Sequence, residues 1–141
     1  MKTLRLLLLV LLVTSAYGAT NRAKQSYLFV NGPFTVDTTF IEVAEMGVTA
    51  GPQFVQITIQ TAGVSPYQGD VACTVLKSNN VTVIPAVLAW PNIPGVGNTA
   101  EIVMQGKGNF GPNDVLQLWC QTDQYPVVIS QISISALEVT P

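Results

Sequence analysis

The sequence contains no histidine, and this absence excludes several classes of enzyme. A Ser–His or Cys–His nucleophilic mechanism needs a histidine base, so neither is available to this chain. Zinc, copper and iron sites that depend on histidine ligands are excluded as well. The chain also lacks a phosphate-binding glycine loop that opens a helix, because Gly106-Lys107-Gly108 lies between two β-prone segments. We therefore expect no metal site and no cofactor; the alternative is a calcium ion held by one loop, for example by Asn113, Asp114 and backbone carbonyls.

Charged residues are scarce, and they make up 10% of the chain against about 25% in ordinary soluble domains. Beyond the first eighteen residues, four basic residues stand against eight acidic ones, a net charge of −4. So few basic residues cannot neutralise a phosphate backbone, and we expect no binding to nucleic acid. Most of the solvent-exposed polar surface must therefore come from Thr, Ser, Gln and Asn side chains. Such a surface suits carbohydrates or further copies of the same chain better than ionic partners.

Only one long apolar run occurs, and it lies near the start of the chain. A positive n-region precedes the apolar residues 6–13, and small residues follow at 15–18. These features predict a secretory signal peptide over residues 1–18, cleaved after Gly18. The run is shorter than the ~20 residues that a membrane-spanning helix requires, so we expect no membrane span.

The rest of the chain is long enough for one domain. Residues 19–25 are polar and predict a flexible N-terminal arm. Residues 26–141 predict a single β-sandwich domain, secreted and extracellular.

Cysteine is rare too, since Cys73 and Cys120 are the only two. In an exported chain, two cysteines most simply form one disulfide. Each lies in a segment with strict period-2 alternation, residues 70–75 and residues 115–120, on the side that we expect to face the core. The sequence therefore predicts a Cys73–Cys120 disulfide that joins two sheets packed face to face.

No segment after the signal peptide has a helical period, whereas β-prone segments recur every 8–12 residues between turn signals. Asn31-Gly32-Pro33 is expected to end the first strand, and residues 106–114 are expected to form a loop. A change of parity within residues 34–43 predicts a bulge or a bend between sheets, and a second bulge is expected near Ala136. The predicted strands are 26–30, 34–43, 53–61, 70–75, 81–84, 86–90, 99–105, 115–120 and 127–139.

About eight short strands of this kind predict an all-β, two-sheet antiparallel sandwich that is jelly-roll-like, with the long last strand beside an early one. The alternative is an immunoglobulin-like sandwich, because Cys73, Trp90 and Cys120 follow the residue order of that fold. Two features count against the alternative. At least three strands precede Cys73, and Leu118 stands where that fold has a tyrosine.

Trp119 is the leading candidate for ligand binding. If the cysteine side of its strand faces the core, Trp119 lies on the outer face between Gln117 and Gln121. A flat ring flanked by amides can stack on a sugar while the amides donate and accept hydrogen bonds. The alternative is that a loop carrying Phe110 or Tyr125 covers Trp119 and makes it structural.

Two further residues are singled out by their positions in predicted loops. Trp90 stands beside the proline-rich loop of residues 91–98 and is a second candidate for ligand binding. Asn80 opens the sequon Asn80-Val81-Thr82 at a predicted hairpin tip, so it is the expected glycosylation site if the source is a eukaryote.

Together these features favour a secreted, non-enzymatic binding or adhesion module whose partner is a carbohydrate. The alternative is a structural subunit of an extracellular matrix, coat or filament. Such a subunit would self-assemble into a homo-oligomer, with the N-terminal arm adding a strand to a neighbouring sheet. A carboxylate-dependent glycoside hydrolase is disfavoured, because none of the eight carboxylates lies in a motif and most fall in turns or at outward positions.

Overall fold

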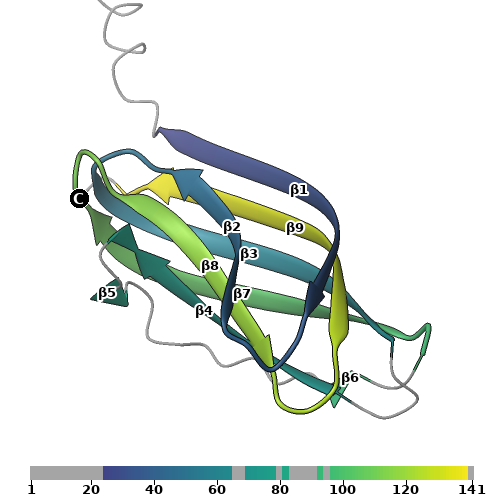
Figure 1. Ribbon diagram of the computed structural model, residues 1–141. Helices are drawn as coiled ribbons and strands as arrows, with labels where there is room; N and C mark the ends of the chain where they lie inside the picture. Colours follow the sequence, from purple (N-terminus) through teal and green to yellow (C-terminus); the bar gives the residue numbers. More distant parts are fainter. Residues whose placement is uncertain (1–23, 65–68, 79–80, 83–91, 94–95, 140–141) are drawn as a thin grey trace, which may run out of the picture.

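The computed structural model describes residues 24–64, 69–78, 81–82, 92–93 and 96–139, which form nine strands (Figure 1). The predicted signal peptide, residues 19–23 of the predicted arm, Asn80 and Trp90 lie outside the described residues. Within the described part, no helix is long and apolar enough to span a membrane. The strands are β1 (Gln25–Val36), β2 (Ile41–Gly47), β3 (Gly51–Gly63), β4 (Gly69–Lys77), β5 (Val81–Thr82), β6 (Asn92–Ile93), β7 (Thr99–Phe110), β8 (Val115–Thr122) and β9 (Val127–Glu138).

The strands form two antiparallel sheets that pack face to face (Figure 1). One sheet has the order β1-β9-β3-β7, and the other has the order β2-β8-β4-β5, with β6 paired to the other end of β4. The last long strand therefore lies between the first and the third, as the Greek-key closure of a jelly roll requires. The predicted jelly-roll-like sandwich is confirmed, and the immunoglobulin-like alternative is not the fold of this chain.

The core lies between the sheets and follows the predicted alternation. Val55, Ile57 and Ile59 of β3 are fully buried, while the residues between them point outward. Most of the predicted inward residues of the other strands are also buried, whereas Phe34, Ile41 and Ala100 are half-buried. Period-2 alternation thus located the apolar face of each strand, since side chains at i and i+2 share one side of a sheet.

The disulfide is present, but it does not join the two sheets. Cys73 of β4 and Cys120 of β8 form the bond, and they stand directly opposite each other within one sheet. Their Cα atoms are 4.2 Å apart, a spacing close to that of a pair in an antiparallel ladder that exchanges no hydrogen bonds. The predicted link between sheets was wrong, because inward parity specifies the face of a strand and not its neighbour. The bond instead joins two adjacent strands of the β2-β8-β4-β5 sheet.

The first strand does not end at Asn31-Gly32-Pro33, as the turn signal predicted. β1 continues to Val36, and its register with β9 shifts between Asn31 and Phe34, which marks a bulge. The Gly32–Pro33 peptide bond is cis. Gly32 lies so close to the carbonyl oxygen of Ile129 that no Cβ atom would fit there. The turn residues therefore serve a bulge within a strand.

Residues 106–110, expected to belong to a loop, extend β7 instead. Gly106 and Gly108 pair with Val55 and Gln53 of β3, and Phe110 is buried in the core. Long-range pairing outweighs the local preference of glycine and asparagine for turns. In this way β7 becomes as long as the strands beside it.

The bulge in the last strand also lies elsewhere than expected. Against β3, Gln131 pairs with Gln60 and Ile129 pairs with Thr61, so Ser130 is the extra residue. Ala136, where the bulge was predicted, is buried and in regular register. The predicted bend within residues 34–43 is confirmed, because the chain crosses from one sheet to the other between β1 and β2.

Candidate functional site

The predicted binding residues lie on the outer face of the β2-β8-β4-β5 sheet. Gln117, Trp119 and Gln121 alternate along β8 with core residues and are all half-buried. Trp119 is stacked on Phe40 from the β1–β2 connection, with ring centroids 5.5 Å apart and an interplanar angle of 26°. One flat side of the indole therefore already has an aromatic partner.

Phe40 stacks on Trp119, although the sequence did not indicate Phe40 as a covering residue. Phe110 is buried in the core between the sheets, and the ring that stacks on Trp119 belongs to Phe40. The indole nitrogen of Trp119 is buried and has no hydrogen-bond partner among the described residues. Trp119 is thus placed as a packed residue of this face, and its role in ligand binding stays a prediction.

Gln117 is engaged by two carboxylates. Its side-chain amide nitrogen donates hydrogen bonds to Glu42 Oε2 at 2.9 Å and to Glu45 Oε2 at 3.0 Å. Burial, followed by the negative charge of Glu45, raises the pKa of Glu42. The donors of this amide are therefore used within the protein, and the surface around it is acidic.

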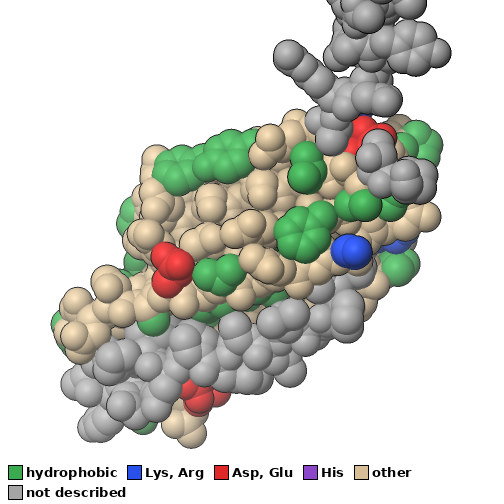
Figure 2. Space-filling view, turned by 180° about the vertical axis from the view of Figure 1, so that it is seen from behind, with side chains coloured by type: hydrophobic (Ala, Val, Ile, Leu, Met, Phe, Trp, Pro, Cys, Tyr) green, Lys and Arg blue, Asp and Glu red, His purple; other side chains and the backbone are tan. Residues whose placement is uncertain are grey.

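The other sheet, β1-β9-β3-β7, has an outer surface that we call the four-stranded face (Figure 2). Its strands are in register, so that outward side chains form rows across all four of them. The rows are Gln25–Leu137–Phe54–Lys107, Tyr27–Ser135–Gln56–Gln105, Phe29–Ser133–Thr58–Val103 and Asn31–Gln131–Gln60–Glu101. The two middle rows contain no charged residue.

Aromatic rings lie exposed along one side of the four-stranded face. Tyr27 is 62% exposed and Phe29 is 46% exposed, and they occupy neighbouring rows on β1. Amide and hydroxyl side chains from β9 and β3 continue both rows. Figure 2 shows a broad surface of polar, uncharged side chains with hydrophobic patches and few charged groups. Rings and neutral polar groups therefore lie side by side on this face.

A hollow of about 370 Å³ lies at one end of the four-stranded face. It is lined by Gln60, Glu101, Ser130 and two neighbours on β7. Ser130, the bulge residue of β9, donates a hydrogen bond from its hydroxyl to the carbonyl oxygen of Gln60 at 3.2 Å. The bulge thus places a serine at the rim of a polar depression.

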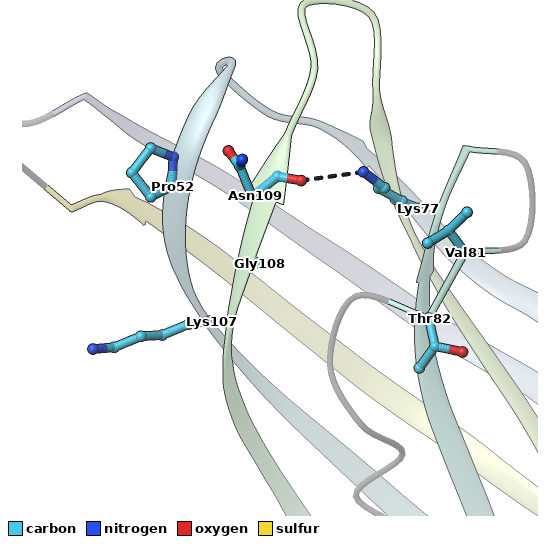
Figure 3. Close-up of a pocket in the computed structure, with 7 residues that line it drawn as sticks. All are labelled: Pro52, Lys77, Val81, Thr82, Lys107, Gly108 and Asn109. Atoms are coloured by element: carbon cyan, nitrogen blue, oxygen red, sulfur yellow. Dashed lines mark hydrogen bonds between the residues drawn. The ribbon is translucent and has the colours of Figure 1, made fainter.

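A second hollow, of about 410 Å³, lies where β3 and β7 approach β4 and β5 (Figure 3). Lys77 Nζ there donates to the carbonyl oxygen of Asn109 at 3.2 Å and pairs with Asp114 at 3.3 Å. Figure 3 shows the side chain of Lys107 pointing away from Lys77. Lys77 is thus engaged by protein oxygens at this hollow.

Asp114 anchors the loop between β7 and β8. The backbone N–H of Gly111 donates to Asp114 Oδ2 at 2.8 Å, and this hydrogen bond, with the nearby Lys77, lowers the pKa of Asp114. Among the described residues, no three or more His, Cys, Asp or Glu side chains lie close enough together to hold a metal ion.

The four-stranded face was missed at the sequence level, although its signal was present. Tyr27 and Phe29 share one parity in the first predicted strand, and Gln56, Thr58 and Gln60 share one parity in the third. Which strands lie next to each other was unknown, so these sets could not be joined into one surface. Gln117, Trp119 and Gln121, in contrast, could be grouped from the sequence alone, because they alternate along a single strand.

None of the protein-family models compared with the sequence matches it, and no curated protein matches it either. The fold is similar to the structure of infectious bursal disease virus, Gx strain, with a TM-score of 0.61 and 11% identity over 84% of this chain and 33% of that chain. It is also similar to the VP2 subviral particle of the same virus, with a TM-score of 0.56 and 12% identity over the same shares. This chain therefore spans about a third of those chains.

A third similar structure is a xylan-binding domain from Paenibacillus barcinonensis. Its TM-score is 0.48, and it shares 16% identity over 84% of this chain and 76% of that domain. At identities this low, the three likenesses concern the fold alone.

Proposed function

We propose that this protein is a secreted, non-catalytic binding module that holds a neutral carbohydrate on the four-stranded face. The observation that carries the proposal is the pair of uncharged middle rows, in which exposed rings on β1 continue into hydroxyl and amide side chains on β9 and β3. The apolar face of a sugar ring stacks on an aromatic ring, and its hydroxyl groups exchange hydrogen bonds with amides and hydroxyls. The hollow at Gln60, Glu101 and Ser130 would receive the end of such a chain.

An extracellular location is the second part of the proposal. The Cys73–Cys120 disulfide supports it, because disulfides persist in oxidising compartments and are rare in the cytosol. The predicted signal peptide over residues 1–18 points to the same compartment.

The absence of catalysis is the third part. Glycoside hydrolysis by the usual route needs two carboxyl groups, one on each side of the bond to be cleaved. Glu101 is the single carboxylate in the four rows of the four-stranded face. Glu42 and Glu45, which lie together, belong to the opposite face and share Gln117 between them. A sugar bound as proposed would therefore meet one carboxylate only.

The test is binding by the secreted chain, beginning at Ala19, to an array of neutral gluco-, xylo- and manno-oligosaccharides. For the oligosaccharide that binds best, calorimetry compares Tyr27→Ala and Phe29→Ala with the control Val81→Ala, an exposed apolar residue on β5 of the other sheet. Each ring variant is expected to weaken affinity about tenfold, roughly 1.4 kcal/mol. The control should change it by less than about threefold.

Three results would count against the proposal. Full affinity in both ring variants would remove the four-stranded face from the proposal. Loss of affinity in Trp119→Ala or Gln117→Ala, with the ring variants unaffected, would move the site to the opposite face. Failure of every oligosaccharide to bind would reject carbohydrate as the ligand.

A self-assembling structural subunit is the second candidate function. The observation in its favour is the long, uncharged strand β1 at the edge of a sheet. An assembling subunit polymerises at high concentration, and deletion of residues 19–25 should prevent this while Trp119→Ala should not. A binding module instead stays monomeric or forms a small closed oligomer, which size-exclusion chromatography distinguishes.

A further inference from the structure

The strands at the ends of the two sheets differ in charge. β7 carries Glu101 and Lys107, and β2 carries Glu42 and Glu45. β5 has only two residues. β1 has twelve residues and no charged side chain. Natural edge strands are protected against pairing with other chains by charged residues, by shortness, by proline or by bulges. β1 is neither charged nor short.

Proline and a bulge are present, but only in the second half of β1. Pro33 and the bulge between Asn31 and Phe34 interrupt that half. The first half, Gln25–Asn31, is regular, because each of its residues has one partner on β9 in unbroken register. Seven consecutive residues of β1 therefore form an uninterrupted edge.

The ladder with β9 shows which backbone groups of this segment face away from the sheet. The carbonyl oxygen of Lys24 accepts a hydrogen bond from the N–H of Glu138 at 2.9 Å, so Lys24 points its backbone groups toward β9. Because direction alternates along an antiparallel ladder, Ser26, Leu28 and Val30 also point toward β9. The backbone groups of the residues between them point to the other side of β1, which has no strand partner among the described residues and which we call the open edge. These residues are Gln25, Tyr27, Phe29 and Asn31.

We propose that β1 pairs with β1 of a second copy, antiparallel, about a two-fold axis at Leu28. In this register Tyr27 stands opposite Phe29 of the second copy, and Gln25 stands opposite Asn31. All four residues direct their backbone groups to the open edge, so each pair exchanges two hydrogen bonds. The two-fold axis repeats every contact, as in an isologous interface. The dimer contains one continuous sheet of eight strands.

The side chains favour this pairing. Aromatic residues directly opposite each other are stabilising cross-strand pairs, and the proposed register makes two Tyr27–Phe29 pairs. No like charges meet along the strand, because β1 has none. The four rings gather at the centre of the widened four-stranded face and remain on its outer side. The dimer does not depend on carbohydrate binding, so either proposal can fail without the other.

The experiment uses the secreted chain beginning at Ala19, with light scattering to measure mass over a range of concentrations and amide hydrogen exchange to map the interface. We expect a dimer at high concentration. We also expect the amides of Tyr27 and Phe29 to exchange slowly in the dimer and quickly on dilution to the monomer. A monomer up to millimolar concentration, or a dimer whose concentration-dependent protection lies on β7, would overturn the proposal.

Two matched double variants test the register. Gln25→Lys with Asn31→Lys places lysines opposite each other twice, and should weaken the dimer about tenfold. Gln25→Lys with Asn31→Glu places opposite charges in the same positions and should leave the dimer at least as tight as the native one. Both positions are exposed, so thermal unfolding should show that both variants fold. Equal dissociation of the two variants would contradict the register.

Discussion

The outer faces of the two sheets use similar residue types differently. On the β2-β8-β4-β5 sheet, the aromatic ring of Trp119 is stacked on Phe40 and the amide of Gln117 is bound by two carboxylates. On the four-stranded face, Tyr27 and Phe29 are exposed, and their rows continue into neutral polar side chains. An aromatic ring beside glutamine is therefore open to a ligand only where neither group is already bound within the protein.

The two sheets also differ in how their strands are held. The strands of the β1-β9-β3-β7 sheet have 12 or 13 residues, whereas β2, β8 and β4 have 7, 8 and 9. Shorter strands make fewer ladder hydrogen bonds. The disulfide between Cys73 and Cys120 lies in this shorter sheet. A covalent bond thus reinforces the sheet with fewer ladder contacts.

Removal of the disulfide should give the largest effect. The variant Cys73→Ala with Cys120→Ala is expected to lose about 2–4 kcal/mol of unfolding free energy, because the bond no longer restricts the unfolded chain. Urea denaturation measures the loss. Amide exchange should increase first in β2, β4 and β8 and should change less in β1, β9, β3 and β7. An unchanged urea midpoint would show that the shorter sheet does not depend on the bond.

Replacement of the covered ring should have the next largest effect. Trp119→Ala is expected to lower the unfolding free energy by about 2 kcal/mol, since a half-buried ring and its contact with Phe40 are lost. Tyr27→Ala should cost less than about 0.5 kcal/mol, because its ring is exposed. A double-mutant cycle of Trp119→Ala with Phe40→Ala should give a coupling of about 0.5–1.5 kcal/mol. Equal costs for Trp119→Ala and Tyr27→Ala would remove the distinction between the faces.

The acidic pair should give a smaller, pH-dependent effect. The pKa of Glu42 is raised above its ordinary value of 4.5, so the folded protein holds this proton more tightly than the unfolded chain does. The contribution of Glu42 to stability is therefore fully present below about pH 4.5 and is lost as the pH rises through the raised pKa of this group. Relative to Glu42→Gln, the native protein should become less stable over that interval, as measured by thermal unfolding. A difference in stability between the two proteins that does not change with pH would show that the pKa of Glu42 is not raised in the folded protein.

Asp114 should show the opposite dependence of stability on pH, and it serves as a control for Glu42. Its pKa is lowered from 3.8, so the stabilising contribution is present above that value and is lost as the pH falls through the lowered pKa. Asp114→Asn should therefore be less stable than the native protein at neutral pH, and the difference should shrink in acid. An NMR titration of the two carboxyl groups checks both directions directly. If Asp114→Asn were as stable as the native protein at neutral pH, the hydrogen bond from Gly111 would not be stabilising.

Local patterns predicted the inward residues well and the ends of strands less well. The alternation in residues 53–61 predicted Val55, Ile57 and Ile59 in the core, because the side of a strand depends only on the parity of nearby residues. The turn signal at Asn31-Gly32-Pro33 was misleading, because pairing with β9 extends across it. Glycine and proline restrict the backbone locally, and they do not tell a turn from a bulge.

By itself, the sequence determined the all-β class, the inward side of most strand segments, the partners of the disulfide and the scarcity of charge on the surface. Each of these depends on composition or on residues close together in the chain. The tertiary structure alone decided that Cys73 and Cys120 are neighbours in one sheet, that Phe40 covers Trp119, and that Tyr27 lies in a row with Ser135 and Gln56. Those contacts join residues far apart in sequence, and period-2 alternation carries no information about which strand lies beside which.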